Sequence, residues 1–264
     1  EEGVGVLGML CLVREGKSEM CVQYWPDEEG KTVDLGGDLT VNTERSWLDQ
    51  PLIDAQEIQV TTLWLSRAGD RRRVYHYQYK SWADLDAPIS PKAVIHLGNL
   101  VRGKQREMVT EDKVALAAPV VVHCSAGVGR SGTFVCLDNA MTALSQDTGG
   151  SQGFSLKRLA MDLRRQRFQA IQTPRQYLFI YQALLSHLKS KRLVPLNTPV
   201  PTDGTMTDAA GEPGTVNTAV PTTASGLPSA GPQTQTFGRP PTRIDQSQQS
   251  RLRKPIKIRS KSRI

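Results

Sequence analysis

One stretch of the chain combines the residue types needed to bind a phosphate group and to attack it: HCSAGVGRSGTF, residues 123–134. Cys124 and Arg130 enclose five residues, so a loop curled around an anion can place a thiol beneath it and a guanidinium beside it. An arginine side chain is a planar fork that donates to two phosphate oxygens at once. The stretch therefore predicts a phosphate-binding loop with a cysteine nucleophile.

The elements that flank this stretch would position it. The β-branched run at 120–122 is typical of a buried strand, and apolar residues recur after the loop at helical spacing. These helix positions are Phe134, Leu137, Met141 and Leu144. A glycine-rich loop between a strand and a helix N-terminus presents backbone N–H groups to an anion. The predicted phosphate cradle consists of the loop backbone and the arginine: Ser125, Ala126, Gly127, Val128, Gly129 and Arg130.

The same surroundings would activate the thiol of Cys124. A helix N-terminus lowers a cysteine pKa to about 3.5–7.5, so a thiolate is expected near neutral pH. This thiolate can attack phosphorus and form a covalent intermediate, and Ser131 could stabilise it when it becomes the leaving group. A buried cysteine beside an ordinary glycine-rich turn is the alternative, and it does not account for the histidine, arginine and serine around it.

The stretch closely resembles the active-site loop of the classical protein tyrosine phosphatases. The resemblance implies hydrolysis of phosphotyrosine-containing protein substrates through a cysteinyl-phosphate intermediate, with no metal or other cofactor. It implies Cys124 as the nucleophile, Arg130 as the phosphate clamp and His123 as a support for the low pKa of the thiol. The implied fold is α/β: a central, highly twisted mixed β-sheet flanked by helices.

A second stretch, YKSWADLDAP at 79–88, resembles the general-acid loop of that family. Trp82, Asp84 and Pro88 match the family pattern, whereas Ala83 replaces a proline and removes a restraint on φ. Asp84 is predicted to be the general acid and then the base, because a tyrosyl oxygen with a reference pKa near 10 leaves poorly unless it is protonated. The alternative is an ordinary strand-to-helix loop with an exposed aspartate.

The segment at 12–26, LVREGKSEMCVQYWP, resembles another part of the phosphatase domain. In that family a glutamate there pairs with the phosphate-binding arginine, and the match falls on Glu15. Met20 stands where a lysine is usual, which changes one supporting contact to the acid loop; an exposed turn carboxylate is the alternative for Glu15. Trp25-Pro26-Asp27 spells the acid-loop triplet, but it completes the CVQYWP pattern and lies 97 residues (124 − 27) before Cys124, so we interpret it as structural.

A third stretch, RRQRFQAIQTPRQY at 164–177, resembles the family's glutamine loop. Gln172 and Gln176 match the two glutamines that position the hydrolytic water, and ordinary core and surface roles are the alternative. Thr173-Pro174 is a good helix start, with an N-cap followed by a proline at N1. Gln169 stands where many members have glycine. Dual-specificity phosphatases lack this element, so it favours the tyrosine-specific branch.

Alternation and turn residues predict the remaining elements. Strands are expected at 4–13, 20–25, 32–41, 57–66 and 74–79, and a helix at 91–109. Gly36-Gly37 and Ala68-Gly69-Asp70 are expected to form turns.

The chain divides into a catalytic domain at 1–192 and a disordered tail at 193–264. From Pro195 onward lie 10 of the 16 prolines and a single aromatic residue, Phe237, which is too little apolar surface to offset the entropy of ordering. The resemblance implies that the family domain normally begins further upstream. We therefore expect an N-terminally incomplete domain that lacks the tyrosine-bearing loop which stacks on the substrate ring.

The basic end of the tail carries most of the net charge. RLRKPIKIRSKSRI at 251–264 has seven Lys/Arg and no acid, and it is compatible with nuclear localisation, contact with an anionic membrane, contact with nucleic acid, or a plain solubilising role. The four cysteines show no metal-binding spacing. We expect reduced thiols in a cytoplasmic protein, with the nucleus as a second location because of the basic tail.

A second hypothesis comes from another functional class. A catalytically impaired pseudophosphatase would bind phosphotyrosine without turnover, and Ala83, Met20 and the missing recognition loop support it. The enzyme hypothesis is favoured because every residue that carries chemistry is present.

Overall fold

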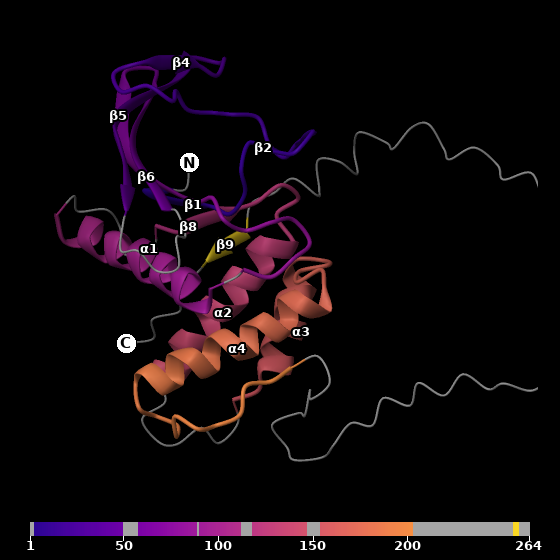
Figure 1. Cartoon of the computed structure of the whole chain (residues 1–264). Coiled ribbons are helices and arrows are strands. Elements are labelled where there is room, and N and C mark those ends of the chain that lie inside the picture. The colour runs from indigo at the N-terminus through magenta and orange to yellow at the C-terminus, as the bar shows by residue number, and fades with distance from the viewer. Residues whose placement is uncertain are drawn as a thin grey trace, which may run out of the picture.

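The computed structural model describes residues 3–49, 58–88, 90–111, 118–146, 154–202 and 256–258. Their main feature is a mixed seven-stranded sheet in the order β4-β5-β6-β7-β1-β8-β9, with four helices packed beside it (Figure 1). The predicted fold class is confirmed. Most of the predicted disordered tail lies outside the described residues. Within the described part of the chain, no helix has the length and apolar character needed to cross a bilayer.

The antiparallel half of the sheet forms from consecutive segments. Its strands are β4 (Thr32–Asp34), β5 (Leu39–Asp49), β6 (Ile58–Arg67) and β7 (Asp70–Tyr79). Ala68 and Gly69 join β6 to β7 with φ angles of 49° and 88°, as a two-residue hairpin turn requires. The predicted turns at Gly36-Gly37 and at 68–70 are thus in place, and the predicted strand at 32–41 is divided by the first of them.

The parallel half of the sheet positions the cysteine loop. β1 (Val6–Met9) lies between β7 and β8 (Val120–His123) and is parallel to both. Met9 and His123 are register partners, so the segments that follow β1 and β8 leave the sheet at the same edge. Cys124 is the first residue after β8 and therefore lies at this edge.

The four helices are α1 (Pro91–Glu111), α2 (Gly129–Gln146), α3 (Leu156–Gln166) and α4 (Pro174–Ser190). In α2 the predicted core positions Phe134, Leu137 and Met141 are buried. α4 begins as predicted: Thr173 is the N-cap, and its side chain and that of Gln176 exchange hydrogen bonds with the backbone as a capping box. The helix start and the glutamine loop are therefore one local structure.

The predicted strand at 20–25 is wrong. A short hairpin of β2 (Arg14–Glu15) and β3 (Ser18–Glu19) precedes this stretch, and residues 20–25 themselves follow an irregular path. Tyr24 and Trp25 both pack against His76 of β7, so neighbouring side chains face the core instead of alternating between two faces. Hydrophobic residues without alternation are compatible with a buried irregular segment.

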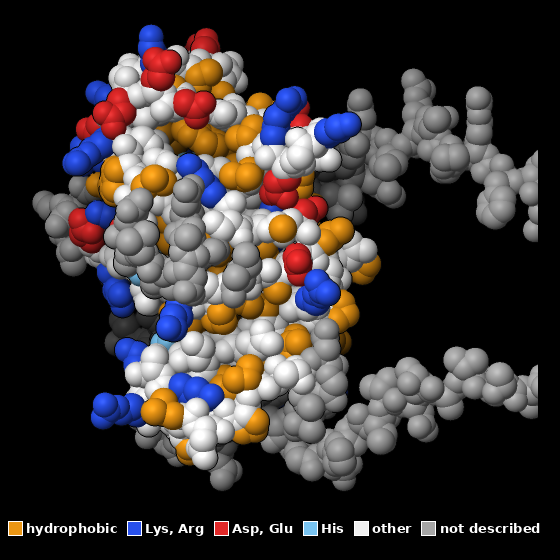
Figure 2. All heavy atoms as spheres, viewed as in Figure 1, with side chains coloured by type: hydrophobic (Ala, Val, Ile, Leu, Met, Phe, Trp, Pro, Cys, Tyr) orange, Lys and Arg blue, Asp and Glu red, His pale blue; other side chains and the backbone are white. Residues whose placement is uncertain are grey.

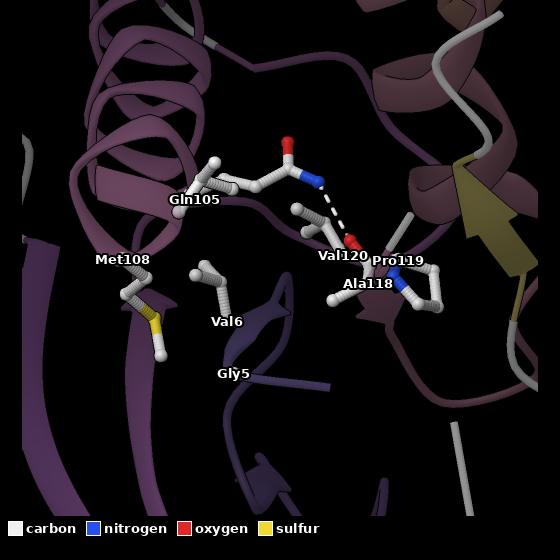
Figure 3. A pocket seen from close by; sticks show the side chains of 8 residues that line it. Gly5, Val6, Gln105, Met108, Ala118, Pro119 and Val120 are labelled. Carbon is white, nitrogen blue, oxygen red and sulfur yellow. Dashed lines mark hydrogen bonds between the residues drawn. The ribbon is translucent and has the colours of Figure 1, made fainter. Parts of the chain in front are cut away.

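Two hollows lie away from the cysteine loop. One lies between α1 and the ends of β1 and β8, where Gln105 Nε2 donates to the Ala118 carbonyl at 2.8 Å and Met108 covers Gly5 (Figure 3). The other is on the sheet and is lined by apolar side chains that include Leu39, Leu63 and Val74. Figure 2 shows hydrophobic side chains between charged groups on the face that it presents. Neither hollow contains a predicted catalytic residue.

A segment of the tail joins the sheet. The sequence pattern assigned all of 193–264 to the tail, but Ile256–Ile258 forms β9, antiparallel to β8, with Val120 opposite Ile258 and Val122 opposite Ile256 (Figure 1). Isoleucine favours strands, and an edge strand offers unpaired N–H and C=O groups to a further strand. A three-residue Ile-Lys-Ile pattern is too short to predict a strand from the sequence.

We predict that deletion of residues 251–264 lowers the melting temperature, because the outer edge of β8 loses its hydrogen-bonded partner. A backbone hydrogen bond contributes about 0.5–1.5 kcal/mol net, and 1 kcal/mol shifts the Tm of a 150–250-residue domain by about 2–4 °C. Calorimetry should show a loss of about 4 °C. Deletion of 215–228, the same length, is the control, and equal Tm values for the two deletions would contradict a contribution of β9.

Candidate active site

The cysteine loop runs from the end of β8 to the first turn of α2. Cys124 is 5% exposed, and Gly127 has a φ of 69°, which lets the chain turn sharply between the strand and the helix. The Val128 carbonyl accepts from the backbone N–H groups of Gly132 and Ile171, each at 3.0 Å. The structure therefore holds the cysteine loop against both its own helix and the glutamine loop.

Arg167, at the C-cap of α3, supports the loop from outside. Its Nε donates to the Gly127 carbonyl at 3.2 Å, and its Nη2 donates to the Ala126 carbonyl at 3.1 Å. Because these carbonyls are engaged away from the cradle, the loop can keep its N–H groups for an anion. Sequence reasoning did not identify Arg167, and its only signal was its place among the arginines of RRQRF.

Arg130 lies at the centre of the site, with only 1% of its surface exposed. Its Nη1 donates to Glu15 Oε1 in an ionic hydrogen bond and to the Trp82 carbonyl at 2.9 Å. Burial disfavours the charged guanidinium, but the hydrogen bond and charge of Glu15, with Cys124 and Asp84, raise the pKa of Arg130 above its usual value. The predicted Glu15–Arg130 contact is thus present.

The guanidinium keeps hydrogen-bonding capacity. Nη2 lies 3.1 Å from Asp84 Oδ1, but the alignment is not that of a hydrogen bond, and Nε and Nη2 have no acceptor among the described residues. Buried donors without acceptors are costly. Nε and Nη2 lie on one edge of the planar guanidinium, and such a pair of donors matches two oxygens of a tetrahedral anion.

The predicted acid loop follows β7 and reaches Arg130. The Trp82 indole is buried between Tyr79 and Phe179, and its Nε1 donates to the Asp86 carbonyl at 2.8 Å. This anchor places Asp84, half-exposed, beside the guanidinium. Ala83 in place of proline therefore does not keep the aspartate from the site.

Asp86 joins the acid loop to α4, a contact that sequence reasoning missed. Asp86 Oδ1 accepts from the backbone N–H of Ala87 at 2.8 Å and from Arg175 Nη1 at 3.3 Å. These two contacts, in that order of size, lower the pKa of Asp86. The Asp86 carbonyl also accepts from Gln176 Nε2 at 3.4 Å. The acid loop and the glutamine loop are therefore directly connected.

Asp27 lies in different surroundings. It is exposed, and the neighbouring Pro26 carbonyl accepts a hydrogen bond from Thr43 Oγ1 of β5 at 2.6 Å. Trp25 is buried against Tyr24 and His76. The structure thus ties this triplet to the sheet, whereas Asp84 lies at the arginine.

The two predicted glutamines lie beside the first residue of α2. A Cβ atom at Gly129 would overlap the Gln172 amide oxygen and come within 3.2 Å of Gln176 Nε2. The Gln176 side chain is buried and accepts from the backbone N–H of Gln172 at 2.9 Å, so it also has a structural role. Gln172 is exposed.

The turn before these glutamines has backbone strain and is held by an arginine side chain. Gln169 and Ile171 have φ angles of 60° and 64°, which explains why glycine would be suited to position 169. Arg164 Nε donates to the Ala170 carbonyl at 2.9 Å, and its Nη2 donates to the Ile171 carbonyl at 2.8 Å. Arg164 thus holds the glutamine loop by two backbone carbonyls, in the same way as Arg167 holds the cysteine loop.

His123 belongs to a buried network centred on Tyr24. The Tyr24 hydroxyl lies 2.7 Å from His123 Nε2 and 3.1 Å from His76 Nε2. Burial lowers the pKa of His76 to about 3; it also lowers that of His123, although the contact of His123 Nδ1 with the Cys124 carbonyl acts in the opposite direction. His123 therefore contacts the backbone of Cys124, and its predicted effect on the thiol stays a prediction. Tyr24 was not identified from sequence.

Ser131 is fully buried in the first turn of α2, and its Oγ has no hydrogen-bond partner among the described residues. A free buried hydroxyl is compatible with the predicted contact to a departing thiolate. Among the residues that the structure describes, no group of three or more His, Cys, Asp or Glu side chains is placed to hold a metal ion.

The fold and this loop define an α/β domain in which a cysteine and a buried arginine share one strand–loop–helix unit at the edge of the sheet. The family model of the protein-tyrosine phosphatases matches residues 1–186, so the chain belongs to the protein-tyrosine phosphatase family.

The chain is similar to known members of this family. The tyrosine-protein phosphatase non-receptor type 9 from Rattus norvegicus is 33% identical over 202 residues, which are 74% of this chain and 32% of the relative. Tyrosine phosphatase H3 from Microplitis demolitor bracovirus is 30% identical over 184 residues, 67% of this chain and 53% of the relative. A solved structure, described as the structural basis of the PTPN18 fingerprint on distinct HER2 tyrosine phosphorylation sites, has a TM-score of 0.60 at 26% identity, covering 71% of this chain and 60% of that one. The chain thus spans about a third to a half of the length of these relatives in sequence.

We predict that Glu15→Ala lowers the free energy of unfolding by about 3 kcal/mol, because removal of one partner leaves a buried charge uncompensated. Urea denaturation measures the change. Glu19→Ala, on the exposed strand of the same hairpin, is the matched control and should stay within about 0.5 kcal/mol. Inorganic phosphate should stabilise both variants by binding to the folded state. Equal stability of the two variants would show that the Glu15–Arg130 pair does not support the fold.

Proposed function

We propose that this domain hydrolyses phosphotyrosine in proteins through a cysteinyl-phosphate intermediate. The observation that carries the proposal is the buried guanidinium of Arg130, next to Cys124 in the loop that opens α2, with two donors that lack an acceptor among the described residues. Such a fork suits the equatorial oxygens of a phosphoryl group. Membership of the protein-tyrosine phosphatase family supports phosphotyrosine as the substrate group.

In the first proposed step the Cys124 thiolate attacks phosphorus and the phosphorus–oxygen bond of the tyrosyl ester breaks. Arg130 and the loop backbone, residues 125–129, hold the phosphoryl oxygens as charge shifts between the attacking and leaving atoms. Asp84 gives its proton to the tyrosyl oxygen. Its position at Arg130, 3.1 Å from Nη2, supports this role, since the acid must lie beside the bound phosphate.

In the second proposed step water replaces sulfur on phosphorus. Asp84, now a carboxylate, takes a proton from the water, and the Gln172 amide, exposed beside Gly129, holds the water together with Gln176. Ser131, whose hydroxyl is buried and unpaired among the described residues, donates to the thiolate that leaves. Inorganic phosphate is then released and the thiolate is restored.

Substrate proteins and location are also proposals. The similar PTPN18 structure concerns HER2 tyrosine phosphorylation sites, and we extend from it only the chemical class of the substrate, a phosphotyrosine in a protein. The cysteines of the described part of the chain are free thiols, which supports the cytoplasm as the location. For the basic segment at 251–264, contact with nucleic acid or with an anionic membrane stays a hypothesis.

Rapid-mixing kinetics with p-nitrophenyl phosphate tests the proposed reaction. A burst of nitrophenol equal to the enzyme concentration is expected, because the first step forms a covalent intermediate. Cys124→Ser should abolish the burst and the turnover but retain binding of a phosphotyrosine peptide, since the cradle is mainly backbone and Arg130. Peptide binding without any burst in the unmodified chain would favour the pseudophosphatase instead.

We predict that Asp84→Ala lowers kcat by about 10²–10⁴-fold, the usual contribution of a positioned general acid, and most strongly for esters with poor leaving groups. Asp27→Ala, in the look-alike triplet, is the matched control, and its kcat should change less than about threefold, which corresponds to the small effect of a surface substitution. Steady-state rates with aryl phosphates of graded leaving-group pKa measure both. The reverse result would show that Asp84 is not the acid.

A further inference from the structure

A third hollow, rich in arginine, lies at the start of β7 and has no part in the proposed reaction. Its volume is about 290 Å³, and it is lined by residues 3–5, Trp64 of β6, residues 71–73 of β7 and Met108 of α1. The register pairs β1 with β7 only from Tyr75 onward. The first residues of β7 therefore extend beyond the end of β1, and the hollow lies beside them.

The indole ring of Trp64 fixes two of the three guanidinium groups. The guanidinium carbons of Arg71 and Arg73 lie 4.1 and 4.7 Å from the centre of this ring. The register explains both contacts, because Trp64 lies opposite Arg73, and Arg71 is the next residue on the same face of β7. A guanidinium that stacks on an aromatic ring keeps the N–H donors at its edge for an anion. Since the ring already orders these side chains, a ligand loses less entropy when it binds them.

The positive charge of this hollow is only partly balanced within the described part of the chain. Arg73 forms an ion pair with Glu44 of β5, with 3.3 Å between Nε and Oε2. Arg71 and Arg72 are exposed, and neither forms an ion pair with another described residue. Two guanidinium groups are therefore left to bind an anionic ligand, and the planar fork of each matches the two oxygens of a carboxylate.

We propose that this hollow is a docking site for an acidic peptide segment of a partner protein, whose Asp or Glu side chains form ion pairs with Arg71 and Arg72. Complementary charge gives such a contact its specificity and a fast association rate. The site lies at the start of β7, whereas the acid loop follows the other end of this strand. A bound segment therefore leaves the edge of the sheet with Cys124 open.

Two observations favour a peptide over a nucleic acid. Surfaces that bind single-stranded nucleic acid stack the bases on aromatic rings, but the ring of Trp64 already carries Arg71 and Arg73. A hollow of about 290 Å³ also has room for only a few side chains. The methylene groups of a glutamate can contact the apolar side chain of Met108 while its carboxylate reaches an arginine.

Fluorescence anisotropy of a labelled peptide of alternating Glu and Thr, titrated with the full chain, tests the docking site. Alternate residues of an extended peptide face the same side, so the glutamates can meet the arginines together. The double variant Arg71→Gln, Arg72→Gln should bind the peptide about tenfold more weakly or worse, because two charge-assisted contacts are lost. Equal affinity of this variant and the unmodified chain would overturn the proposal.

The matched control removes the same charge from the same sheet. Arg45 and Arg67 are exposed on β5 and β6 and do not line the hollow. The double variant Arg45→Gln, Arg67→Gln should bind the peptide within about twofold of the unmodified chain, as expected for distant charges screened by salt. Calorimetry should give the same Tm for all three chains. Equal losses of affinity in the two double variants would overturn the proposal, since net charge alone would then explain the binding.

Competition with other polyanions identifies the class of partner. A single-stranded oligonucleotide and phosphatidylserine vesicles should displace the peptide only weakly, and an oligonucleotide or vesicle that binds the hollow more tightly than the peptide would overturn the proposal. The peptide should leave the turnover of p-nitrophenyl phosphate unchanged, whereas competitive inhibition would place it at Arg130 and overturn the proposal as well. A chain without turnover would speak against the proposed function alone, because the anisotropy measurement needs no catalysis.

Discussion

The buried charge of Arg130 is the constraint on which the rest of the site depends. A guanidinium with 1% exposure is stable only where partners replace the water it has lost. Those partners come from separate parts of the chain: Glu15 from the β2–β3 hairpin, and the Trp82 carbonyl and Asp84 from the acid loop. The environment of the buried guanidinium therefore depends on the hairpin, the acid loop and α2 together.

The loops of the site are held in place by hydrogen bonds from side chains to their backbone carbonyls. Arg167 holds the cysteine loop by two carbonyls, and Arg164 holds the glutamine loop in the same way. Arginine suits this role because its donors form a rigid fork. The acid loop has a different brace, the buried Trp82 indole, with Asp86 linked to Arg175 and Gln176. These contacts fix the positions of the loops, and reacting groups must be held in a defined geometry for a reaction to be fast.

The strand β8 links the site to two other features of the chain. It leads directly into Cys124, its inner edge pairs with β1, and its outer edge pairs with β9 from the tail. The segment after β1 leads into the hairpin with Glu15. The register of the sheet and the Glu15–Arg130 pair therefore meet at one edge of the sheet, where the ends of two parallel strands lie together.

Local patterns determined much of this protein. The strand–loop–helix around Cys124, the hairpin turn at Ala68-Gly69 and the capping box at Thr173 depend on residues a few positions apart, so the sequence alone could predict them. The resemblance to a family identified Glu15 and Asp84 as residues of the site. No local pattern could have linked Glu15 to Arg130, which lies 115 positions further along the chain. Only the tertiary structure decided the roles of Tyr24 and Arg167, the irregular path at 20–25 and the pairing of β9. Each of these depends on segments that meet through packing of the whole domain, and no periodicity along the chain records which distant side chains such packing brings together.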